Sequence, residues 1–253
     1  WIVAQNLGDG TIDFIEKQYI DYNFKESTLI WDISSDNDNF IFIIEQKSVN
    51  LNKHQTKFYK YYIKKEHIEL FQISKIEKLE LENYLISKIF KNITLSSKIE
   101  VDEERPDYYW GKYLFHFMDE NKQFYRPSFD NIIDYSKDKG HLIHYIEETN
   151  KKMVYDFDNE GNPVSRKYFI IFSIRHKNKD NSKSYHYKIY SAYSDDLKYF
   201  YDTKEIQIKN NITESKWYCY PEVFKKDNKY YVLLNQDDFG KEKESLLGEL
   251  IIK

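Results

Sequence analysis

The 253-residue chain has only one cysteine, Cys219, and this scarcity excludes an intramolecular disulfide and any metal site built from several thiolates. It has four prolines and seven glycines, and no Pro- or Gly-rich linker divides it, so we expect a single domain over residues 1–253. No apolar run approaches the length of a membrane span. Together with the lone thiol, this predicts a cytoplasmic protein. The start at Trp1 rather than Met indicates a processed or excised piece, which is consistent with a part of a larger multidomain protein.

An excess of positive charge is also lacking. The net charge is −4, from 38 Lys and Arg against 42 Asp and Glu, so there is no broad positive field of the kind that nucleic-acid binding uses. The seven histidines show no zinc-ligand spacing, and neither a phosphate-binding glycine loop nor a nucleophilic serine elbow occurs. We therefore expect no metal, no cofactor and no nucleic-acid partner.

Aromatic residues are abundant, with 24 Tyr, 17 Phe and 4 Trp. They favour half-buried strands and offer flat faces on which sugar rings can stack. A polar turn followed by an aromatic, apolar strand recurs four times, at 36–44, 110–117, 165–172 and 227–234. The spacing is irregular but fits one small sheet per repeat, which predicts an all-β chain with the radial repetition of a propeller.

One segment has a different period. Ile76, Leu79, Asn83, Ile86 and Phe90 fall at helical spacing with Glu and Lys between them. This pattern predicts one amphipathic helix inserted between sheets over residues 73–93.

Five phrases in the C-terminal part occur in the order of a known family. They are Tyr125-Arg126-Pro127-Ser128-Phe129, Phe172-Ser173-Ile174-Arg175, the segment 190–200, the segment 216–224, and Lys229-Tyr230-Tyr231 with Asn235. In this order they resemble the five-bladed β-propeller glycosidases and glycosyl-transferring enzymes of the arabinanase, xylosidase, invertase and levansucrase group. The likeness covers about residues 105–253 and is greatest to propeller proteins of bacterial polysaccharide gene clusters. It implies a five-bladed propeller, complete or incomplete.

The resemblance also implies three carboxylates around a central axis, one of them a Glu general acid just before the strand of Pro221. The chain departs from the pattern there, because the usual position holds Cys219 and the variant position holds Lys216. Glu214 and Glu222 are the nearest replacements. In a strand, a displacement by an odd number of residues moves a side chain to the opposite face. The sequence therefore does not decide whether Glu214 or Glu222 faces the central cavity.

Asp32 is the expected base or nucleophile of the first blade, because it follows an apolar strand and precedes a turn. Asp107 and Asp130 compete for the second acid, since each follows an Arg and a Pro within a few residues. All three also fit the role of an ordinary turn or strand-end aspartate. Glycoside cleavage needs two such carboxyl groups, one protonated and one ionised.

The expected substrate-binding residues are arginines and aromatic or amide side chains. Arg126 and Arg175 can clamp a carboxylate, a phosphate or sugar hydroxyls through paired hydrogen bonds, although surface ion pairing explains them equally well. His176 stands beside Arg175 and can assist it. The remaining predicted binding residues are Trp217, Tyr220 and Asn235.

These observations predict a carbohydrate-active domain that hydrolyses or transfers a glycosyl unit in bacterial polysaccharide metabolism. Its expected partners are an oligosaccharide, a polysaccharide or an activated sugar. The alternative is a non-catalytic carbohydrate-binding domain of a larger polysaccharide-synthesis enzyme, because the expected acid is missing at Cys219 and Lys216. A protein-interaction propeller rests on fold analogy alone.

Overall fold

The computed structural model describes residues 2–6, 12–17, 27–47, 56–66, 73–79, 84–91, 93–100, 112–130, 139–149, 156–157, 163–164, 166–177, 185–207, 217–237 and 245–251. These residues form strands and turns, with no α-helix among them. The chain divides into two compact units, Trp1–Asn83 and Tyr84–Lys253, which are described separately. The expectation of one domain over 1–253 stays a prediction.

The first unit contains a two-stranded sheet of β1 (Ile2–Asn6) and β2 (Ile12–Lys17), and one larger sheet. This first sheet consists of β3 (Ser27–Ser35), β4 (Asn39–Lys47), β5 (Thr56–Lys64) and β6 (Ile73–Leu79). The strands follow the chain order and each is antiparallel to the next. Asp36 shapes the β3–β4 turn, because its carboxylate accepts hydrogen bonds from the backbone N–H of Asp38 (2.8 Å) and of Asn39 (2.6 Å).

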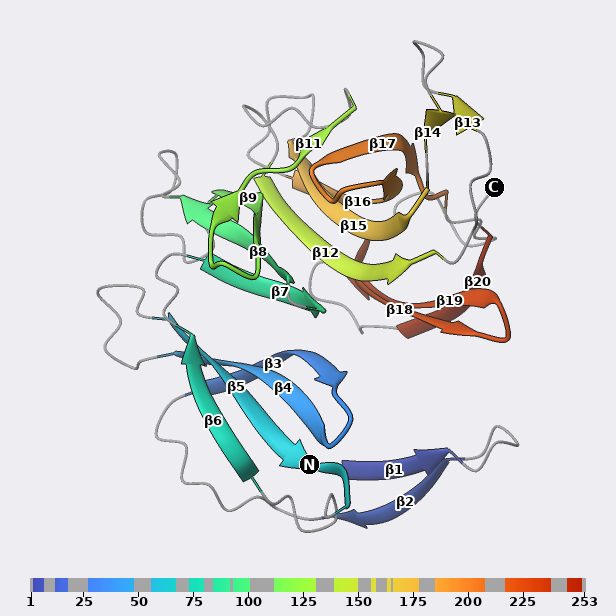
Figure 1. The fold of residues 1–253 in the computed structure, drawn as a ribbon. Helices are drawn as coiled ribbons and strands as arrows, with labels where there is room; N and C mark the ends of the chain where they lie inside the picture. The colour runs from blue at the N-terminus through green and yellow to red at the C-terminus, as the bar shows by residue number, and fades with distance from the viewer. Residues whose placement is uncertain are drawn as a thin grey trace. The chain divides into compact units, whose positions relative to one another are not determined.

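The second unit contains three larger sheets (Figure 1). The second sheet consists of β7 (Tyr84–Phe90), β8 (Ile93–Glu100), β9 (Lys112–Met118) and β10 (Phe124–Tyr125). The third consists of β12 (Lys139–Glu148), β15 (Tyr168–Lys177), β16 (Tyr185–Ser194) and β17 (Tyr199–Glu205), with β11 (Ser128–Phe129) parallel to β17. The fourth consists of β18 (Trp217–Lys226), β19 (Lys229–Asp237) and β20 (Ser245–Leu250). A small hairpin joins β13 (Asp156–Phe157) to β14 (Pro163–Val164).

The third sheet is buried on both faces, which explains its nearly continuous apolar strand β15. Ile170 and Phe172 pack with Leu95 and other residues of the second sheet. Phe169 and Ile171 pack, on the opposite face, with residues of the fourth sheet. The second unit is therefore a face-to-face succession of antiparallel meanders, which is the packing of neighbouring propeller blades.

The predicted helix over 73–93 is wrong. Residues 73–79 form β6 and residues 84–90 form β7, while residues 80–83 lie outside the described part. Ile76 is exposed, whereas a helical apolar stripe would have buried it. Pairing of β6 with β5, and of β7 with β8, satisfies the backbone hydrogen bonds and overrides the weak helical period.

Each of the four larger sheets has a bulge of one residue in its first strand against its second strand. The shifts fall between Ile30 and Asp32 in β3, Ile86 and Lys88 in β7, Ile143 and Tyr145 in β12, and Cys219 and Glu222 in β18. A second shift in β12 falls between Lys139 and Leu142. A bulge moves the following side chains to the face opposite the one that regular alternation gives them. It thus decides the direction of the polar residues that follow in each first strand.

Candidate carboxylate site

The β3 bulge places Asp32 on the Ile43 face of the first sheet. With regular alternation, Asp32 would lie on the opposite face. Ile30 lies opposite Ile44, so without the extra residue Asp32 would lie opposite Phe42, whose face is an apolar cluster. With the bulge, Asp32 lies opposite Ile43 and shares its face. The side chain of Asp32 is only 6 % exposed.

Glu45 lies on this same face, because it is two residues beyond Ile43 in β4. It is 1 % exposed, so two buried carboxyl groups share one face of the first sheet. Asp32 and Glu45 are diagonal neighbours across the β3–β4 ladder, a relation that sets Cβ atoms about 7–8 Å apart or somewhat less. Glycosidic cleavage needs two carboxyl groups roughly 5–5.5 Å apart for retention or 6.5–9.5 Å apart for inversion, and side chains that are diagonal neighbours on one face are within reach of each other.

The face becomes polar toward the outer strands. Lys60 of β5 lies next to Ile43, and Glu77 of β6 lies next to Lys60. The Tyr62 hydroxyl donates a hydrogen bond to Glu77 (3.1 Å), and partial burial together with this carboxylate raises the pKa of Tyr62 to about 12. Lys75 forms an ion pair with Glu77 at 3.3 Å. The carboxylate of Glu77 is therefore neutralised locally.

The sequence analysis did not select Glu45 as a site residue, although its position after a continuous apolar run indicates burial. It ends the run Phe40–Ile44, and a run without alternation indicates a strand buried on both faces. A carboxylate that directly continues such a strand is rarely buried without a partner or a function. The bulge at residue 31, by contrast, left no sign in the sequence.

The other predicted carboxylates all belong to the second unit. Asp107 and Glu214 lie outside the described residues. Glu222 of β18 is exposed and lies opposite Leu233. Asp130, the rival of Asp107, accepts hydrogen bonds from the backbone N–H (3.1 Å) and the hydroxyl of Thr203, which fastens the connection between the second and third sheets.

The predicted binding residues are dispersed over the second unit. Arg126 is exposed in the connection from β10 to β11. Arg175 lies opposite Tyr187 in the β15–β16 pair, and His176 Nε2 is 2.8 Å from the Tyr190 hydroxyl. Trp217 and Tyr220 belong to β18 and Asn235 belongs to β19, but their side chains lie outside the described part.

A second polar group sits at the β12 bulge. His144 is the extra residue there, and its Nε2 is 2.6 Å from the hydroxyl of the buried Ser173. Burial, aided by the charge of Lys88, lowers the pKa of His144 from 6.5 to about 3. The imidazole is therefore neutral at physiological pH and pairs with Ser173 by a hydrogen bond between neutral groups.

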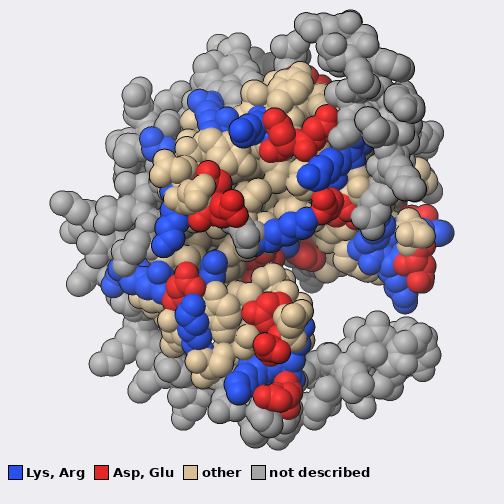
Figure 2. Space-filling view, viewed as in Figure 1, with Lys and Arg blue, Asp and Glu red and all other residues tan. Residues whose placement is uncertain are grey.

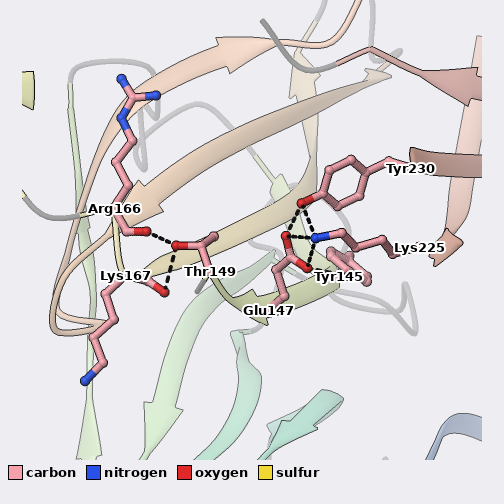
Figure 3. Close-up of polar contacts among 7 residues, drawn as sticks. All are labelled: Tyr145, Glu147, Thr149, Arg166, Lys167, Lys225 and Tyr230. Carbon is pink, nitrogen blue, oxygen red and sulfur yellow. Dashed lines mark hydrogen bonds and ion pairs between the residues drawn. The ribbon is translucent and has the colours of Figure 1, made fainter. Parts of the chain in front are cut away.

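Sequence reasoning also missed a cluster that joins the third and fourth sheets. Figure 3 shows Tyr145, Lys225 and Tyr230 pointing toward Glu147. The Tyr145 hydroxyl (3.1 Å), the Tyr230 hydroxyl and Lys225 Nζ (3.1 Å) all donate to its carboxylate. Nearby, the Thr149 hydroxyl donates to the carbonyl oxygens of Arg166 and Lys167 and fixes the end of β12 (Figure 3). Because every donor in the Glu147 cluster is engaged, it acts as a clamp between sheets.

The described surface gives no support to a nucleic-acid or metal site. Figure 2 shows Lys and Arg interspersed with Asp and Glu on the visible face, without a broad area of one sign. No group of three or more His, Cys, Asp and Glu side chains suited to a metal ion occurs in the part of the chain that the structure describes. Within the same residues, no helix has the length and apolar character needed to cross a bilayer.

Comparison with known proteins gives little. No family model matches the chain, and neither does any curated protein. Among solved structures, the chain is similar to the β-propeller domain of the trilobed protease from Pyrococcus furiosus, with 10 % identity over 87 % of this chain and 83 % of that chain. The TM-score is 0.28, which is too low to support a conclusion, so the fold described above rests on the sheets of this chain.

Proposed function

We propose that the chain is a carbohydrate-active domain that hydrolyses or transfers a glycosyl unit, with Asp32 and Glu45 as its pair of carboxyl groups. The observation that carries the proposal is the presence of both groups, 6 % and 1 % exposed, on one face of the first sheet. The proposed substrate is an oligosaccharide, a polysaccharide or an activated sugar, as the resemblance of the C-terminal phrases implies. The proposed architecture is a five-bladed propeller to which the four larger sheets contribute blade-like meanders.

The pair supplies the two groups that the reaction needs. One carboxyl group protonates the leaving oxygen, and the other acts as a base toward water or as a nucleophile toward the anomeric carbon. Burial limits the access of bulk water to both groups, which strengthens their electrostatic interaction with a developing oxocarbenium charge. Asp32 is held by a bulge and Glu45 by a central strand, so both groups are attached to rigid backbone.

The test compares Asp32→Asn and Glu45→Gln with the matched control Glu77→Gln. The control removes a carboxylate from the same face, but from the outer strand β6. With aryl glycosides, oligosaccharides and activated sugars as a substrate panel, we expect Asp32→Asn and Glu45→Gln each to lower turnover by about 100-fold or more. Glu77→Gln should keep wild-type turnover. Circular dichroism and thermal unfolding confirm that each variant is folded.

Unchanged turnover in both variants would reject the proposed catalytic pair. If folded Asp32→Asn and Glu45→Gln both turn over substrate at the wild-type rate, the pair is not the catalytic pair. A pH–rate profile adds a second criterion, because loss of the acid removes its alkaline limb and loss of the base removes its acidic limb.

The exposure of Glu222 favours the second candidate function, a non-catalytic carbohydrate-binding domain. Glu222 was the preferred replacement for the missing acid, and an exposed carboxylate on an outer sheet face is poorly placed to protonate a leaving group. A glycan array separates the two functions. Binding without any cleaved or transferred product would favour the binding domain, whereas a product that depends on Asp32 and Glu45 would reject it.

A further inference from the structure

We draw no further inference here: the strongest candidate, the apolar face of the β18–β20 sheet that carries Leu233 and Leu247, is a sheet face for which nothing in the structure shows what covers it.

Discussion

Protonation of His144 should destabilise the protein at mildly acidic pH, and the structure sets the size of the effect. Burial, together with the charge of Lys88, lowers the pKa of His144 from 6.5 to about 3. Between these two values the unfolded chain binds a proton that the folded chain does not. The free energy of unfolding therefore falls as the pH drops below 6.5, by about 1.4 kcal/mol for each pH unit. At pH 5 the contribution is about 2 kcal/mol.

The variant His144→Gln isolates this contribution. Glutamine cannot be protonated, and its side-chain oxygen can accept a hydrogen bond from Ser173 in place of the imidazole. Urea unfolding at pH 7.5 and pH 5.0 gives the loss of stability for each protein. We expect the wild type to lose about 2 kcal/mol more than His144→Gln between these two pH values.

Carboxylates elsewhere in the chain titrate equally in both proteins, so the difference between them reports His144 alone. Proton NMR of the imidazole provides a direct check, because the Cε1–H signal of His144 should not shift between pH 7.5 and pH 5. A His144 signal that titrates near pH 6.5, or an equal loss of stability in both proteins, would refute the reasoning.

Two further predictions concern stability. Leu197 is buried, and its φ of 63° lies in the left-handed region that is unfavourable for residues with a Cβ atom. In urea unfolding, Leu197→Gly should therefore be about 1 kcal/mol more stable than Leu197→Ala. A more stable alanine variant would contradict this. Burial and the Glu147 carboxylate raise the pKa of both Tyr145 and Tyr230 above the usual 10. Their contribution to stability is complete below about pH 10 and is lost as the pH rises further, since the unfolded chain then releases protons that the folded chain retains. Unfolding measured from pH 9 to 11 should show this fall, and Tyr145→Phe and Tyr230→Phe should each reduce it.

Much of the strand content could be predicted because its cause is local. The aromatic, apolar runs predicted as strands are confirmed in β4, β9, β15 and β19. The turn at Asp227 and Asn228 is confirmed too, with φ of 50° and 60° as a tight hairpin requires. Asp and Asn adopt positive φ at a low free-energy cost, and aromatic and β-branched residues favour strands. Both preferences act within a few residues and need no tertiary contact.

The prediction of a helix over residues 73–93 was wrong because pairing with distant strands, and not the local sequence, decides the structure of this segment. The residues of 73–79 suit either period, and pairing with β5 decided the outcome. The same limit applies to the site. Asp32 was selected from the sequence as the end of an apolar strand, but its membership of the Ile43 face follows from the register of β3 on β4.

By itself, the sequence of this protein determined an all-β chain of repeated antiparallel strands, since composition and turn residues act within a few positions of one another. It did not determine which side chains meet. The tertiary structure decided that Asp32 and Glu45 share a face, because a bulge of one residue reverses the direction of every following side chain in the strand. Such a shift arises from hydrogen bonds to a neighbouring strand, and only the folded ladder records it.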